Sequence, residues 1–186
     1  MTDRPPTPEP SPAELSPVGA FARLFAYLLD AVILGLAIYL VALVVRAVLG
    51  PTIHFLDVDG SMRVLVDRPR SIVDAAVATA IAGAYFVGSW LTIGRTPGQR
   101  LIGARVVAAS GSGRLRPPAA IVRWLLLGAP VGLITVILGP PPPVTLAIST
   151  LLACWYLVLF LTTALDGRKR GLHDRLARSL VGRQGS

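Results

Sequence analysis

The sequence predicts an all-α membrane protein, a four-transmembrane-helix bundle with a short interfacial helix and strand in one loop and a cytoplasmic C-terminal tail. Two observations carry this prediction. The chain of 186 residues is 53% hydrophobic but only 15% charged, whereas ordinary soluble domains are about 25% charged. It also contains four apolar stretches, each close to the roughly 20 helical residues that cross a bilayer core of about 30 Å.

The four predicted spans are residues 21–49, 72–93, 121–138 and 144–165. The third is the shortest, and the proline run "GPPPP" at 139–143 forms a turn between it and the fourth. Residues 19–182 therefore make one membrane domain. The proline-rich segment 1–18 has too few apolar residues to fold and is predicted to be a disordered cytoplasmic tail, and residues 183–186 a disordered end.

The distribution of basic residues predicts the orientation of these spans. With four crossings, fourteen of the eighteen basic residues fall on the side that holds both termini and the loop 94–120. Basic residues concentrate on the cytoplasmic side of membrane proteins. We therefore expect a multi-pass protein of a bacterial plasma membrane with both termini in the cytoplasm; the bacterial source is indicated by the bias to arginine, with a single lysine.

The loop 94–120 and the C-terminal tail are unusual for a simple helix bundle. Arginines alternate with aliphatic residues in the loop, which predicts an interfacial turn, a short helix and then a strand, "ARVVA". The tail contains a similar aliphatic stretch, "RSLVG", on the same side of the membrane. We expect the loop and the tail to form a cytoplasmic cap on the bundle, in which these two segments pair.

Charged residues inside apolar helices indicate where a functional site would lie. Asp30 lies within the first span, and ionised carboxylates are costly in hydrocarbon unless they are paired or functional. Arg123 opens the third span at the same inner level, so we predict that it pairs with Asp30. Arg23 and Asp174 are expected to close this polar cluster from the cytoplasmic side. A site for a proton or cation and a purely structural salt bridge are both open readings of Asp30.

Several function classes are disfavoured by what the sequence lacks. It contains no glycine-rich phosphate loop, no zinc-ligand spacing and no nucleophile–base motif, so we expect no enzyme, no cofactor and no metal site. The single cysteine, Cys154, excludes an intramolecular disulfide. The net charge of +8 is explained by basic residues at the ends of the spans rather than by nucleic acid.

Four motifs in order resemble the RDD family of small bacterial membrane proteins: "RLFAYLLD", "GRTPGQRLIGARVV", "VRWLL" and "GLHDRLARSLV". The family is named for one arginine and two aspartates, which the resemblance places at Arg23, Asp30 and Asp174. Ser179 stands where members usually have threonine.

The resemblance implies a transport component, because proton or ion exchange is proposed for some RDD proteins. Four helices are few for alternating access, so a transporting form would be a homo-oligomer or have a membrane partner. The alternative is a non-catalytic accessory or scaffold protein whose basic cytoplasmic face binds anionic lipid headgroups or a protein partner.

Overall fold

The computed structural model describes residues 15–110, 113–127 and 142–184. The elements follow one another along the chain as β1 Leu15–Pro17, α1 Ala20–Leu49, β2 Ile53–Val58, β3 Ser61–Val66, α2 Arg68–Thr92, α3 Pro97–Leu101, β4 Ala104–Ala108, α4 Pro117–Leu126, α6 Pro142–Leu165, α7 Leu172–Leu176 and β5 Ser179–Gln184.

Three helices of the described chain are long and apolar enough to cross a membrane: α1, α2 and α6. They match the predicted spans 21–49, 72–93 and 144–165 to within a few residues. The predicted third span, 121–138, begins within α4, but its remainder lies outside the described residues. Little of the surface of the three long helices is buried within the protein, as expected for helices whose neighbours are lipid.

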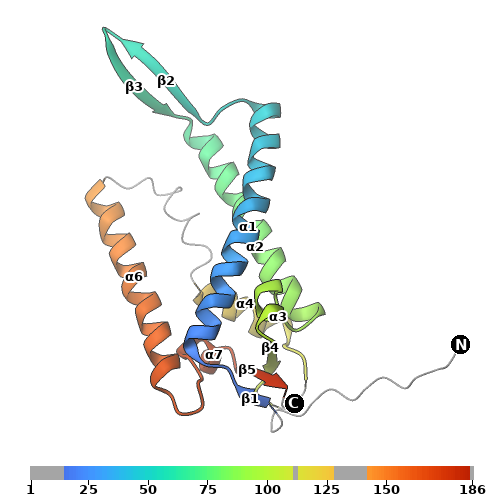
Figure 1. Cartoon of the computed structure of the whole chain (residues 1–186). Coiled ribbons are helices and arrows are strands. Elements are labelled where there is room, and N and C mark those ends of the chain that lie inside the picture. Colours follow the sequence, from blue (N-terminus) through green and yellow to red (C-terminus); the bar gives the residue numbers. More distant parts are fainter. Residues whose placement is uncertain (1–14, 111–112, 128–141, 185–186) are drawn as a thin grey trace, which may run out of the picture.

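The protein is mostly helical, as predicted, but it contains more strand than an all-α fold allows, because the described residues form two small sheets. Strands β2 and β3 form an antiparallel hairpin that extends beyond one end of α1 and α2 (Figure 1). Strands β1, β5 and β4 form a three-stranded antiparallel sheet at the opposite end. We refer to this second sheet, together with α3 and α7, as the cap.

The cap joins three segments that are far apart in the sequence. Strand β4, from the loop, pairs with β5, from the C-terminal tail, so that Val107 lies opposite Leu180; this confirms the predicted pairing of "ARVVA" with "RSLVG". Strand β1 adds to the other side of β5. The N-terminal segment, the loop and the tail therefore lie at the same end of the bundle. The strands β1 and β5 include residues 15–17 and 183–184, which the sequence analysis assigned to disordered ends.

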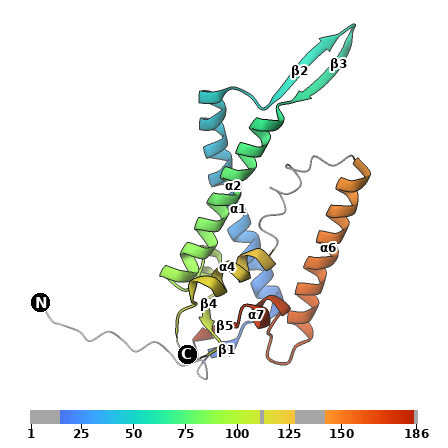
Figure 2. The same cartoon turned by 180° about the vertical axis from the view of Figure 1, so that it is seen from behind.

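The cap rests on a compact apolar core. Trp90 at the end of α2 is fully buried and packs with Val106, Leu115, Ala120 and Val181. Helix α4 packs across α2, where the Trp124 ring lies so close to Gly83 that a β-carbon there would come within 3.3 Å of it. Helix α6 stands apart from α1 and α2 along most of its length and meets the cap at its C-terminal end, as both views show (Figures 1 and 2).

Candidate functional site

Asp174 lies at the centre of a buried charge cluster between the helices and the cap. Its two carboxylate oxygens accept hydrogen bonds from two different arginines, Arg23 of α1 and Arg123 of α4, in ion pairs. The side chains of Asp174 and Arg123 are fully buried, and that of Arg23 is 6% exposed. Helix α7, which carries Asp174, is therefore connected by charge to two helices of the bundle.

Arg123 is held on several sides. It donates to the Ser179 hydroxyl at 2.7 Å and to the Tyr27 hydroxyl at 3.1 Å. Its guanidinium carbon also lies 5.2 Å from the centre of the Trp90 ring, within the range of a cation–π interaction. Ser179 thus provides the hydroxyl group that the threonine usual at this position of the family would provide.

Arg23 links the cluster to the backbone of the cap. Its Nε donates to the Val18 carbonyl at 2.9 Å, and its second terminal nitrogen donates to the carbonyls of Lys169 at 2.6 Å and Val181 at 3.3 Å. All three nitrogens of the guanidinium therefore have partners. Because breaking such a buried network leaves polar groups without water or partners, the cluster is expected to hold the cap in one position.

The charges of the cluster determine its protonation. Burial disfavours the ionised form of Asp174, but Arg123 and Arg23 outweigh this effect, so the pKa of Asp174 lies well below its usual range. Next to it, burial and, after it, the positive charge of Arg123 together lower the pKa of His173 to about 4. At neutral pH the cluster therefore holds an ionised Asp174, two charged arginines and a neutral His173.

Asp30 forms a separate centre, with neutral partners. Its Oδ1 accepts from the Tyr85 hydroxyl and from the Gly98 backbone N–H, both at 2.7 Å, and its Oδ2 accepts from the Thr96 hydroxyl at 2.5 Å. The side chain is fully buried. Among the residues that the structure describes, no arginine, lysine or histidine forms an ion pair with it.

The chain turns back toward Asp30 because of a short motif after α2. Thr96 caps α3 and Gln99 returns a hydrogen bond to the Thr96 N–H at 3.0 Å, which is a capping box. At Gly98 a β-carbon would lie 2.9 Å from the Asp30 carboxyl group and would also press on the Ala26 carbonyl. Glycine is therefore required where this segment meets α1.

The predicted pair of Asp30 with Arg123 was wrong. Arg123 contacts Asp174, and the oxygens of Asp30 are taken by Tyr85, Thr96 and Gly98. The prediction compared only depth in the membrane; it did not foresee that the loop folds back onto α1 and supplies neutral donors there. The two centres are joined indirectly, since the Trp90 ring lies against Arg123 while its N–H donates to Gln99 at 3.3 Å.

Sequence reasoning therefore named the four charged residues, and Ser179 through the family motif, but it missed the other neutral residues around them: Tyr27, Tyr85, Trp90, Thr96, Gly98 and Gln99. One signal was available, because Thr96 and Gln99 have the spacing of a capping box.

Comparison with known families identifies the chain. The model of the RDD family matches residues 17–178. The protein belongs to the RDD family. No curated protein and no solved structure matches it. In this RDD protein Arg23 binds Asp174, whereas Asp30 occupies its own centre. Membership in the family and the apolar helices together make it an integral membrane protein.

The chemistry that this arrangement allows differs between the two carboxylates. Asp174 is already neutralised by two guanidinium groups, so a proton or cation would have to displace them. Within the described residues Asp30 has only neutral donors, so it can take up a positive charge without breaking an ion pair there. In the described part of the chain no cluster of three His, Cys, Asp or Glu side chains is placed to hold a metal ion.

Proposed function

We propose that this RDD protein is a transport component of a bacterial plasma membrane that exchanges protons, and that Asp30 is the group that binds the proton. The single observation behind this proposal is the environment of Asp30: a fully buried carboxylate on a spanning helix, with three neutral donors and no ion-pair partner among the described residues. Ionisable residues within membrane spans commonly mark proton or ion pathways.

The partners of Asp30 favour a proton over a metal cation. The hydroxyl groups of Thr96 and Tyr85 can rotate and accept a hydrogen bond when Asp30 is protonated. The Gly98 N–H, in contrast, points at Oδ1 at 2.7 Å and cannot act as a ligand to a cation. Any cation exchanged for the proton would therefore bind elsewhere, for which a homo-oligomer or a membrane partner offers the additional surface.

In this proposal both termini and the cap lie in the cytoplasm. The concentration of basic residues on the cap side supports that orientation. Two single cysteines in a Cys154→Ala background test it, one at Ser61 in β3 and one at Ser110 after β4. A membrane-impermeant maleimide added to intact cells should label the first and not the second, and the reverse pattern would overturn the orientation.

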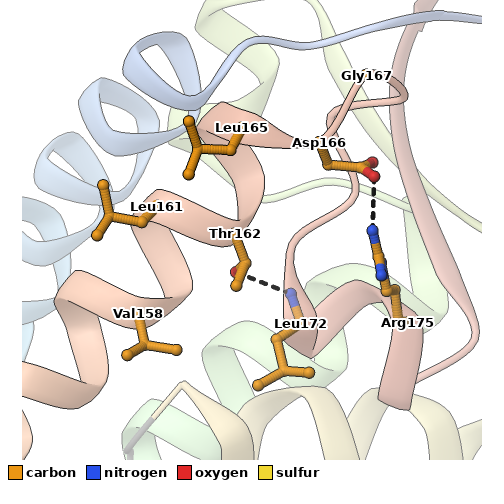
Figure 3. Close-up of a pocket in the computed structure, with 8 residues that line it drawn as sticks. All are labelled: Val158, Leu161, Thr162, Leu165, Asp166, Gly167, Leu172 and Arg175. Carbon is orange, nitrogen blue, oxygen red and sulfur yellow. Dashed lines mark hydrogen bonds and ion pairs between the residues drawn. The ribbon is translucent and has the colours of Figure 1, made fainter.

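A second candidate function is a non-catalytic accessory protein that binds lipid or a protein partner through its cap. Two observations favour it. Arg100, Arg116, Arg168 and Arg178 are exposed in or beside the cap. A groove of about 510 Å³ between α6 and α7 also combines an apolar wall with the Asp166–Arg175 pair, whose charged atoms are 2.5 Å apart (Figure 3). Such a groove suits a phospholipid with one chain along α6 and its headgroup at the pair.

Proton flux into proteoliposomes separates the two candidates. Asp30→Asn keeps the size of the side chain and can still accept from Gly98 and Tyr85, so the variant should fold and lose the flux. The matched control is Asp74→Asn, which alters a carboxylate at the far end of α2 that bonds to Thr52 at 2.6 Å. Unchanged flux in a folded Asp30→Asn variant would reject the transport proposal, whereas binding to anionic vesicles that depends on the exposed arginines would support the accessory role.

A further inference from the structure

A second cavity lies between the helices, and Asp30 is not among the residues that line it. It has a volume of about 570 Å³ and is bordered by residues of α1, α2, α4, α6 and α7. This volume is typical of sites for small organic ligands, which span roughly 300–1,000 Å³. Its walls are mostly apolar and include Leu24, Leu28 and Leu34 of α1 and Phe160 of α6. The end nearest the cap is polar and includes Arg23, Thr163 and His173.

Two buried polar groups at this cavity lack hydrogen-bond partners within the described chain. Both ring nitrogens of His173 are without a partner, and the residue is only 4% exposed. The indole N–H of Trp124, which also lines the cavity, has none either. His173 Nε2 lies 3.4 Å from the Asp174 carboxylate, a contact that would count as an ion pair only if the ring were protonated. Buried polar groups are nearly always hydrogen-bonded, so these two call for a ligand or water.

The local charge indicates which ligand would satisfy them. Arg23 and Arg123 carry two positive charges close to His173, and Asp174 supplies one negative charge, which leaves this end of the cavity positive. Burial has the largest effect on the low pKa of His173, and this excess of positive charge also contributes to it. An acceptor group with negative charge is favoured there by the field and by the free donors of His173 and Trp124.

We propose that this cavity binds an anionic amphiphile, with one acyl chain between α1 and α6 and a carboxylate or phosphate head at His173 and Trp124. The bilayer around the helices supplies such molecules, either as free fatty acids or as anionic phospholipids. This site is separate from Asp30, and it does not depend on proton transport.

Quenching of tryptophan fluorescence by bromine on an acyl chain tests the proposal. The full chain, with Trp155→Phe, is placed in phosphatidylcholine nanodiscs, so that Trp124 remains at the cavity while Trp90 is fully buried. Dibromostearate is added as the carboxylate probe, its methyl ester as the neutral probe and dibrominated phosphatidylglycerol as the phosphate probe. At neutral pH the acid should quench at a concentration about tenfold lower than the ester, because charge-assisted hydrogen bonds are the stronger ones.

Two variants assign the quenching to the cavity. Ala82→Phe fills it and should remove the preference for the acid, whereas Ala80→Phe, on the same helix but outside the cavity, should not. His173→Gln should bring the acid and the ester closer together. Equal quenching by acid and ester in the parent protein, or an acid preference that survives Ala82→Phe, would overturn the proposal. Stronger quenching by the phosphatidylglycerol than by the fatty acid would identify the phospholipid as the source.

Discussion

The structure makes a sharp prediction about which charged residues are coupled. In a double-mutant cycle of Asp174→Asn and Arg123→Gln, each single change removes one member of a fully buried ion pair. Breaking such a pair is expected to lower the free energy of unfolding by about 3–5 kcal/mol, because the remaining charge is left buried without its partner. Asp174→Asn should be the more damaging change, since it leaves both Arg23 and Arg123 without a counter-charge, while Arg123→Gln leaves Asp174 with Arg23.

The double variant should recover part of this loss, with a coupling energy of about 1–3 kcal/mol. The second cycle, Asp30→Asn with Arg123→Gln, is the control, because these residues share no hydrogen-bond partner among the described residues. Its losses should add to within about 0.5 kcal/mol. Unfolding in mixed detergent–SDS micelles, followed by circular dichroism, measures all five variants. Coupling in the control cycle and additivity in the first would refute the assignment of Asp174 as the partner of Arg123.

Two further predictions concern close packing and pH. Gly98→Ala should lower the free energy of unfolding by about 1–3 kcal/mol through overpacking against Ala26 and Asp30, whereas Gly88→Ala, which has open space, should cost nothing in the same micelle assay. The pKa of His173 is lowered to about 4 in the folded protein, from about 6.5 in the unfolded chain, so below pH 6.5 the unfolded state binds the proton first. Stability should therefore fall by up to about 3 kcal/mol as the pH drops from 6.5 to 4 and stay level above 6.5; a pH titration of unfolding in which His173→Gln keeps the full slope would contradict this origin.

Hydropathy alone predicted the long helices well, because the thickness of the bilayer fixes both their length and their composition. The pairing of β4 with β5 was also predictable, since both are short aliphatic segments that were expected on one side of the membrane. The hairpin β2–β3 was missed, although its sequence contains a signal. Asp59 and Gly60 form the two-residue turn, both with positive φ, and an Asp-Gly pair is typical of such hairpin turns.

The partners of the charged residues were less predictable, and the reason is geometric. Position along a helix gives the depth of a side chain, but not which loop folds over it. The turn at Gly94, with φ of 74°, and the capping box at Thr96 direct the chain after α2 back toward α1. The three residues of β1, the last of which is Pro17, have no periodicity from which a strand could be inferred.

The arrangement explains why one arginine and one aspartate seven residues apart on α1 act on different parts of the chain. Asp30 binds the segment that leads into β4, through Thr96 and Gly98. Arg23 binds Asp174, in the segment that leads into β5. Since β4 and β5 pair with each other, the segments that lead into both strands are held by the same helix, α1. A proton on Asp30 would weaken its hydrogen bonds with the segment that leads into β4 and would leave the Arg23–Asp174 pair intact. The buried carboxylate of Asp30 is thus connected directly to the cap, and in the proposed function this connection would carry the effect of proton binding to the cap.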